Sequence, residues 1–342
     1  MPKIGSRSAF ALAVAFALAA TPVVAAMIWS LRARPHGQWD AFALWNVRAR
    51  HLAGPGSWRI VASAEFDPVV PDYPLLVPGA VALAGAVPVA MFFLVATTAV
   101  IMFSVARLHS TELSLLAGLV FLTSRTYLWE AAGLCADVPL SFFILAAIVL
   151  ILFERPALAG LCASLAAWTK NEGIAFLALF LVLGAIFLRR RAFPLALCAA
   201  SLTLALAVFK LFIADQGYLA AQSPGRALAL LADPERYLAI AKQLAIVVFG
   251  FGQGFIHPIL LMAILACAYK VHAGALKHPS TRFALTALLL LFAGYLGVYL
   301  VTPLELRWQL STSLSRLICH VWPAGLVLSC VFLRRPDATM SS

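Results

Sequence analysis

The sequence predicts an all-α, polytopic membrane protein, and its composition and patterning carry that prediction. Hydrophobic residues make up 63% of the 342 residues, charged residues make up 11%, and the mean hydropathy is +0.96. A soluble domain is nearer half apolar and a quarter charged. The apolar residues form long runs separated by short basic segments, and no polar stretch is long enough for a separate soluble domain. We therefore expect a single membrane domain over residues 1–342.

Apolar runs of suitable length predict about ten transmembrane helices. A shorter apolar stretch, 75–86, contains Pro78 and is expected to form a helix at the outer surface. Boundaries read from a sequence are the least certain feature of such an assignment. The spans are placed near 9–30, 87–106, 110–124, 137–153, 157–168, 174–188, 193–213, 239–266, 283–301 and 317–333.

The basic residues predict the orientation. The N-terminus, with Lys3 and Arg7 before an apolar run, resembles a signal peptide, but the run is longer than a typical apolar core of such a peptide. We interpret it as an uncleaved first span that begins in the cytoplasm. Cytoplasmic ends then carry Lys or Arg throughout, as the positive-inside rule requires. They hold Arg107, Arg155, Arg189, Arg190, Arg191, Lys270, Lys277, Arg282, Arg334 and Arg335.

This topology places both termini in the cytoplasm, with a short tail at 334–342 and a long first outer loop at 31–86 that carries juxtamembrane helices. The net charge of +11 does not indicate nucleic acid, because the basic residues lie in the loops between spans. Membrane lipids are the expected surroundings. The six cysteines show neither a CxxC pair nor a Cys/His metal spacing.

The unusual polar residues all fall on the predicted outer side. Ionisable residues at membrane depth are costly, so they mark a candidate functional site. Two spans, 157–168 and 174–188, are short for a bilayer, and the "TKNEG" segment between them is expected at the floor of an outward-facing cavity. The candidate residues are Asp40, Asp72, Tyr73, Asp137, Lys170, Glu172, Glu305, Arg307, Arg316 and His320.

Each of these residues also has a purely structural interpretation. Asp40 and Asp137 suit helix starts, and Asp72 suits a turn. Lys170 and Glu172 can pair only with each other. Arg316 can reach to the membrane interface and His320 can simply pack, while Trp39 and Trp45 are typical interface anchors. None of these interpretations explains why all the residues share one side.

Four segments, "GQWDAFALWN", "PDYPLLVP", "ADVPLSFF" and "TKNEG", resemble in order and location those of the GT-C superfamily of membrane glycosyltransferases. The pattern is similar to protein mannosyltransferases that use a polyprenyl-phosphate sugar and to lipid A aminoarabinose transferases. The resemblance extends over roughly residues 9–333. One difference is that the protein mannosyltransferases have an Asp-Glu pair where this chain has Asp40 and Ala41. That difference argues against a protein acceptor.

The resemblance implies a sugar moved, with inversion, from a polyprenyl-phosphate donor to a hydroxyl of a lipid, glycan or protein. It implies a site on the periplasmic face of a bacterial inner membrane and Asp40 as the general base. Lys170 and Arg316 are expected to bind the donor phosphate. Asp72, Tyr73 and Asp137 are expected to position substrate, and Glu172 to orient Lys170, while Glu305, Arg307 and His320 are weaker candidates.

We predict no metal or other cofactor, because no acidic or Cys/His spacing is typical of a ligand set, although some members of the superfamily use a divalent metal. Two other classes stay open. A transporter or flippase for lipid-linked sugars predicts ionisable groups at the membrane midplane and internal repeats. A non-catalytic membrane partner predicts that each outer carboxylate is dispensable.

Overall fold

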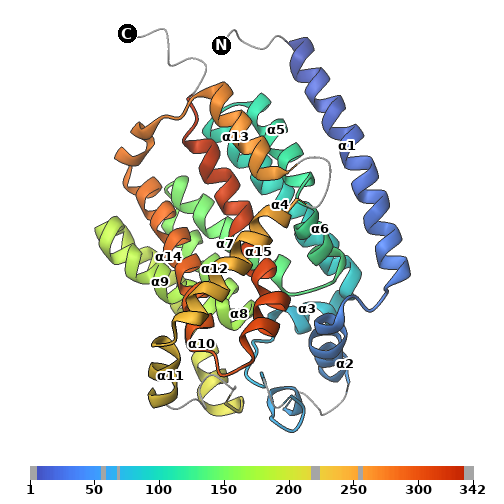
Figure 1. The fold of residues 1–342 in the computed structure, drawn as a ribbon, viewed down its shortest axis with the longest axis vertical. Coiled ribbons are helices and arrows are strands. Elements are labelled where there is room, and N and C mark those ends of the chain that lie inside the picture. The colour runs from blue at the N-terminus through green and yellow to red at the C-terminus, as the bar shows by residue number, and fades with distance from the viewer. Residues whose placement is uncertain (1–5, 55–58, 68–69, 217–223, 253–256, 335–342) are drawn as a thin grey trace.

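The computed structural model describes residues 6–54, 59–67, 70–216, 224–252 and 257–334 of the chain. It is 84% helical and has no strand among those residues, which confirms the all-α fold class. Figure 1 shows a bundle in which α1 (Ser6–Ala33) begins, and α15 (Leu306–Val331) ends, at the same end of the molecule.

The remaining helices follow one another with short connections. Two π-helical segments, Ala41–Asn46 and Phe209–Ile213, and three short 3-10 segments, Ile60–Ala62, Arg189–Arg191 and Ala273–Lys277, lie between them. The α-helices are α2 (Val47–Ala53), α3 (Leu76–Ala84), α4 (Ala86–Leu108), α5 (Thr111–Leu122), α6 (Arg125–Ala132), α7 (Asp137–Leu152), α8 (Pro156–Thr169), α9 (Asn171–Leu188), α10 (Ala192–Val208), α11 (Pro224–Leu231), α12 (Pro234–Gly250), α13 (Pro258–Tyr269) and α14 (Pro279–Val301).

The structure supports a multi-pass membrane protein in part. Among the described residues, five helical stretches are long and apolar enough to cross a membrane: Phe10–Ala33, Ala86–Leu108, Asn171–Ile213, Pro279–Val301 and Leu306–Val331. Four shorter apolar helices, α5, α7, α8 and α13, accompany them. The predicted count of about ten spans is therefore not confirmed, whereas the helix expected at 75–86 is present as α3.

The predicted single span at 239–266 is wrong. Two helices occupy this region: α12, which ends at Gly250, and α13, which begins at Pro258. Proline at the first position of a helix is favourable, but inside a helix it removes a hydrogen bond and clashes with the preceding turn. His257 supports the new start, because its Nδ1 accepts a hydrogen bond from the backbone N–H of Ile259 at 3.3 Å.

The core is built around α7. Its sequence is apolar on all sides, which is typical of a helix with no solvent-facing stripe. It packs against α4, α8 and α15, and most of its side chains are buried. The helix begins at Asp137, which is fully buried. The centre of the bundle therefore contains an ionisable group, and that group needs partners.

Glycine allows α8 and α10 to pack closely. A Cβ on Gly160 of α8 would lie 2.1 Å from the carbonyl oxygen of Leu195 in α10, closer than any real contact. At the next helix break, a Cβ on Gly173 would lie 1.9 Å from the carbonyl oxygen of Ala166. These two positions hold α8 between its neighbours α9 and α10.

The first loop is bound to the bundle by backbone contacts. Gly37 has φ +76°, a conformation that glycine adopts readily. The next residue, Gln38, donates its backbone N–H to the carbonyl of Gly133 at 2.9 Å. A Cβ on Gly133 would lie 2.5 Å from the Gln38 side chain. The approach brings the segment that carries Asp40 next to the turn that precedes α7.

The rest of this loop folds around Arg48. Its fully buried guanidinium donates to the carbonyls of Val61 and Val70 at 3.2 and 2.7 Å and to Asp67 at 3.0 Å. Burial lowers the pKa of Arg48, and the Asp67 carboxylate opposes that shift. Helices expected within 31–86 are present as α2 and α3, and Arg48 of α2 contacts Val61, Asp67 and Val70 between them.

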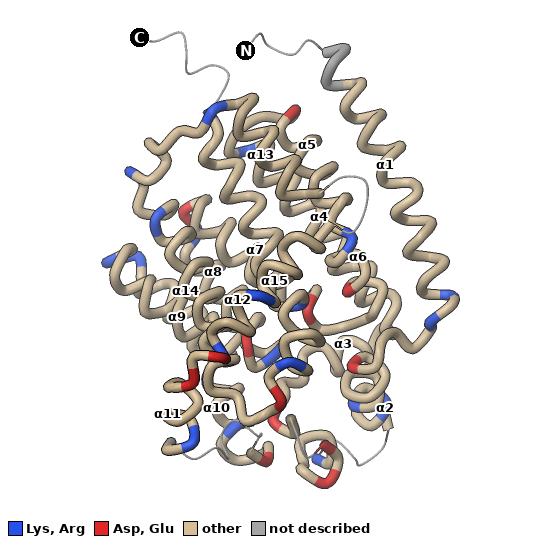
Figure 2. Tube along the Cα trace, viewed as in Figure 1, with Lys and Arg blue, Asp and Glu red and all other residues tan. Residues whose placement is uncertain are grey.

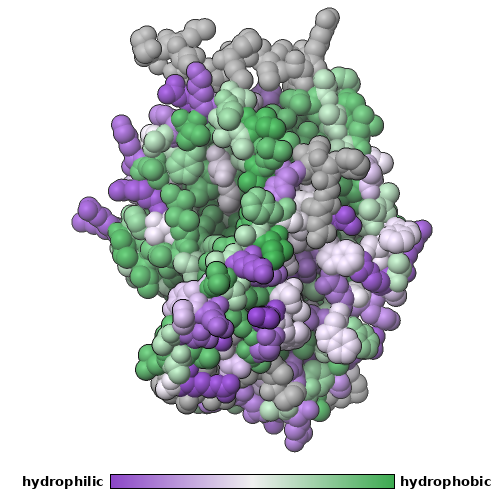
Figure 3. Space-filling model, viewed as in Figure 1, coloured by the Kyte–Doolittle hydropathy of each residue, from purple (hydrophilic) through white to green (hydrophobic). Residues whose placement is uncertain are grey.

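Charge and hydropathy differ between the two ends of the molecule. Figure 2 shows most of the acidic residues in the half away from the start of α1. Hydrophobic residues cover much of the other half in Figure 3, and hydrophilic residues are frequent below them. Lys3 and Arg335, and all of the predicted tail except Arg334, lie outside the described residues.

Gly160→Ala should destabilise the protein by about 1–3 kcal/mol, because the added methyl group meets backbone that has no room to move. Gly184→Ala in α9 is the matched control, since its nearest contact would be an ordinary 3.5 Å. Thermal unfolding of both variants in detergent measures the difference. Equal melting temperatures for the two would show that α8 and α10 can separate without cost.

Candidate functional site

The site centres on the carboxylate of Asp137, at the start of α7. Oδ1 accepts hydrogen bonds from Lys170 Nζ at 3.0 Å and from His320 Nε2 at 2.7 Å. Oδ2 accepts two from Arg316, from Nε at 3.1 Å and from Nη2 at 2.8 Å. A buried carboxylate is tolerated when it is paired and hydrogen-bonded in this way. Three segments of the chain therefore meet at the Asp137 carboxylate: α7, α15 and the break between α8 and α9.

His320 has a defined tautomer in this arrangement. A carboxylate only accepts hydrogen bonds, so Nε2 of His320 carries the proton. Nδ1 then accepts from the hydroxyl of Tyr295 at 3.3 Å. Both side chains are buried. The interpretation of His320 as a packed residue accounts for its burial but omits its bond to Asp137.

Arg316 connects the buried carboxylate to the surface. Its Nη1 lies 2.5 Å from Oδ2 of Asp40, whose side chain is 31% exposed. Asp40 precedes the π-helical segment Ala41–Asn46 but makes no side-chain capping hydrogen bond, so the interpretation as a helix cap is wrong. Arg316 is not an interface anchor either, because it bridges Asp40 and Asp137.

Lys170 lies at the break between α8 and α9. Its extended backbone, φ −154° and ψ 163°, stops one helix before the next begins. Its ammonium pairs with Asp137 and with Glu172, each at 3.0 Å. Lys170 and Glu172 thus do not pair only with each other. The side chain of Glu172 is 24% exposed, although its Oε2 is buried and has no hydrogen-bond partner among the described residues.

A second polar group joins the first loop to the same helix break. Asp72 accepts from Asn171 Nδ2 at 3.1 Å and from Lys210 Nζ at 2.7 Å. Its neighbour Tyr73 stacks on Trp45, with ring centroids 5.4 Å apart. Trp45 is 1% exposed, so its predicted role as an interface anchor is wrong, whereas Trp39 is 76% exposed.

Two predicted residues are not part of either group. Glu305 caps α15, because its carboxylate accepts from the backbone N–H groups of Arg307 at 3.0 Å and Trp308 at 2.5 Å. Arg307 is exposed. The first turn of α15 therefore explains both residues, and the site begins more than two turns further along, at Arg316.

Sequence reasoning missed Glu130 and the role of Lys210. Glu130 lies in α6, is 5% exposed, and has an Oε2 with no hydrogen-bond partner among the described residues. Burial raises its pKa to about 7, and the Asp137 carboxylate adds to the shift. A glutamate in the apolar stretch "YLWEAAGL", so close to the "ADVPLSFF" segment, was the available signal.

Glu130, Cys135 and Asp137 offer ligand atoms that all lie within 4.8 Å of one another. Both oxygens of Asp137 already accept from Arg316, Lys170 and His320. A divalent cation here would compete with two positive side chains. This donor set does not fit a divalent metal ion. The absence of a metal cofactor stays a prediction.

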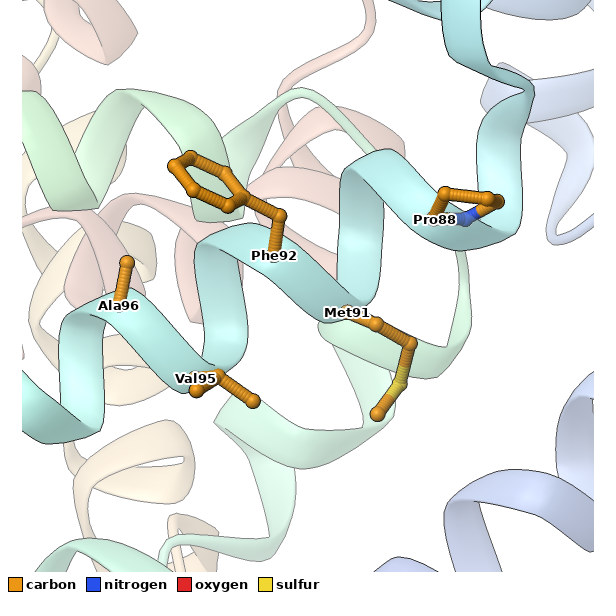
Figure 4. Close-up of a pocket in the computed structure, with 5 residues that line it drawn as sticks. All are labelled: Pro88, Met91, Phe92, Val95 and Ala96. Carbon is orange, nitrogen blue, oxygen red and sulfur yellow. The ribbon is translucent and has the colours of Figure 1, made fainter.

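One apolar hollow lies outside the network, on α4. It is lined by Pro88, Met91, Phe92, Val95 and Ala96, and Figure 4 shows their side chains along one stretch of that helix. Phe92 and Val95 are 62% and 61% exposed. A surface without a polar side chain offers no catalytic group, and it suits contact with lipid.

No protein-family model, no curated protein and no solved structure matches this chain. The resemblance to the GT-C superfamily therefore rests on the sequence segments quoted above.

Glu130→Gln should stabilise the protein at high pH. The carboxyl has a pKa of about 7 when folded and 4.5 as its ordinary value, so folding favours its protonated form. Its contribution to stability is complete below about pH 4.5, declines as the pH rises to about 7, and is constant above that. The variant should gain about 3 kcal/mol at pH 8 and nothing at pH 4.5.

Melting temperatures measured from pH 4.5 to pH 8 test this. Glu235→Gln, at an exposed site in α12, is the matched control for the loss of one carboxylate. A difference between Glu130→Gln and wild type that stays constant from pH 4.5 to pH 8 would contradict the buried, proton-bearing carboxyl.

Proposed function

We propose that this protein is an integral membrane glycosyltransferase. It moves a sugar from a polyprenyl-phosphate donor to a hydroxyl of a lipid, glycan or protein acceptor, with inversion and with Asp40 as the general base. The observation that carries the proposal is the guanidinium of Arg316, which joins the partly exposed Asp40 to the buried Asp137.

The pairing of Asp40 suits a base. Arg316 engages Oδ2, whereas no hydrogen bond to Oδ1 occurs within the described part of the chain. A carboxylate held by one oxygen keeps the other for a hydroxyl proton, and general-base catalysis of this kind contributes about 10²–10⁴ in rate. The acceptor oxygen then bonds to the anomeric carbon, Asp40 takes the proton, and the phosphate leaves with the electron pair of the broken bond.

The two cations retain donors for that phosphate. A guanidinium has five N–H groups, and Arg316 uses three of them on Asp40 and Asp137. An ammonium has three, and Lys170 uses two on Asp137 and Glu172. Arg316 is thus able to fix the base and to bind the leaving group with the same planar side chain.

The surroundings of Asp40 suit a lipid-linked donor. Trp39 is 76% exposed and Phe42 is 44% exposed, on either side of Asp40 in the chain. Exposed aromatic rings at the end of a membrane span are typical of the lipid interface. Most of the acidic residues lie in the half of the molecule away from the start of α1 (Figure 2). With the N-terminus in the cytoplasm, as the basic residues predict, that half faces the periplasm of a bacterial inner membrane.

Asp40→Asn should reduce transfer at least about 100-fold while the protein stays folded, because the amide cannot take the hydroxyl proton. The measurement is lipid mass spectrometry on membranes of cells that lack the protein, complemented with wild type or variant. Wild type should remove an accumulated polyprenyl-phosphate sugar and Asp40→Asn should not.

Asp233→Asn is the matched control, since Asp233 caps α12 and asparagine caps equally well. It should restore transfer fully. Full restoration by Asp40→Asn would remove Asp40 from the role of base. A donor that crosses the membrane unchanged, without loss of its sugar, would favour the transporter or flippase instead.

A further inference from the structure

Lys210 lies in the π-helical segment Phe209–Ile213, next to side chains that face outward from the bundle. Its neighbours Leu211 and Phe212 are 74% and 80% exposed. π-Helical segments are rare and occur frequently at functional sites. A charged lysine among apolar side chains is costly unless it is paired, so Lys210 is a candidate functional residue whose partners need to be identified.

The ammonium of Lys210 has three acceptors. They are the backbone carbonyl of Asp72, the Asp72 carboxylate at 2.7 Å, and the side-chain oxygen of Asn171 at 2.5 Å. Asn171 Nδ2 donates back to the same carboxylate at 3.1 Å and closes the ring. The three N–H groups of an ammonium are thereby all used.

This saturation distinguishes Lys210 from the other two cations of the site. Lys170 and Arg316 both keep N–H groups for a ligand, as counted above. Lys210 keeps none in this arrangement. A phosphate could reach the ammonium only by displacing Asp72 or Asn171. Lys210 instead joins the Asp72 loop to the α8–α9 break, and we call the group of Lys210, Asp72 and Asn171 the clamp.

The clamp is linked to both ends of the ionic network. Asn171 stands between Lys170 and Glu172 in the chain, and both of those residues belong to the network. On the other side, Tyr73 follows Asp72 and stacks on Trp45, in the π-helical segment that begins directly after Asp40. A shift of the Lys210 ammonium would therefore move the phosphate-binding cation relative to the base.

We propose that Lys210 is a positioning residue of the transfer reaction, which holds the Asp72 loop against the α8–α9 break so that Lys170 and Asp40 keep their separation. The proposal rests on the proposed glycosyltransferase function. It assigns no contact between Lys210 and the substrate. It differs from a phosphate-binding role in what it predicts for donor affinity.

The test compares Lys210→Met with wild type in lipid nanodiscs. Transfer should fall about tenfold or more, because small misplacements of reacting groups cost that much. The affinity for polyprenyl phosphate, used as the probe, should change less than about threefold, since the variant leaves the N–H groups of Lys170 and Arg316 in place. Hydrogen exchange should rise in 71–76 and 169–173 and stay unchanged in α14. Lys210→Arg should recover part of the transfer rate.

Lys242→Met is the matched control, at an exposed position of α12, and should change none of these measurements. Should Lys210→Met fail to insert, the double variant Lys210→Met, Asp72→Asn removes both charges together and avoids an unpaired carboxylate. It should show the same loss of transfer and the same rise in exchange.

Three outcomes overturn the proposal. A loss of polyprenyl-phosphate affinity of about tenfold or more, with inorganic phosphate competing, would make Lys210 a phosphate ligand instead. Unchanged exchange in the two segments would show that the clamp holds nothing. Raised exchange with an unchanged transfer rate would make Lys210 purely structural. Failure of the proposed function looks different, because wild type itself would then transfer no sugar.

Discussion

The rest of the structure depends on the neutralisation of one buried carboxylate, that of Asp137. Moving an ion out of water costs several kcal/mol even after the protein relaxes. Arg316, Lys170 and His320 offset that cost with four hydrogen bonds to the two oxygens. They come from α15 and from the α8–α9 break, so these segments must pack against the first turn of α7. As a consequence α8 packs closely against its neighbours, and Gly160 allows its close approach to α10.

The network continues from Asp137 to two further side chains. Each of the two cations beside Asp137 also pairs with a second carboxylate, so three carboxylates share two cations. Arg316 takes Asp40 and Lys170 takes Glu172, and both of these side chains are partly exposed. Under the proposed function Asp40 is the carboxylate that meets the substrate, whereas the buried Asp137 holds the cations in place.

Much of the site could be predicted from the sequence, for a physical reason. In a chain with few charges, ionisable side chains inside the bundle must find one another. Asp40, Asp137, Lys170, Arg316 and His320 do so. Glu305 and Arg307 do not, because Glu305 instead caps the backbone N–H groups at the start of α15 and Arg307 is exposed.

The spans were harder to predict, because hydropathy does not register a backbone break. The stretch 239–266 is mostly apolar on both sides of "GFGQGFIHP", and within it α12 ends at Gly250 and Pro258 begins a new helix. Glu130 was missed because a single glutamate among apolar residues gives no periodic signal. The partner of Lys210 was not predictable, because nothing in the sequence around Lys210 points to Asp72, 138 positions earlier.

The helix break at Lys170 makes a charged site compatible with a membrane. α8 has 14 residues, about 21 Å of helix, against a hydrocarbon core of about 30 Å. A helix of this length that starts at one face ends before it reaches the other. Polar backbone at that depth is tolerated where protein groups satisfy it. At this break the backbone N–H of Gly173 donates to the carbonyl of Lys170, while the side chains of Lys170 and Asn171 bind Asp137, Glu172 and Asp72. The break that shortens α8 is therefore also the feature that gathers the carboxylates and cations of the candidate site.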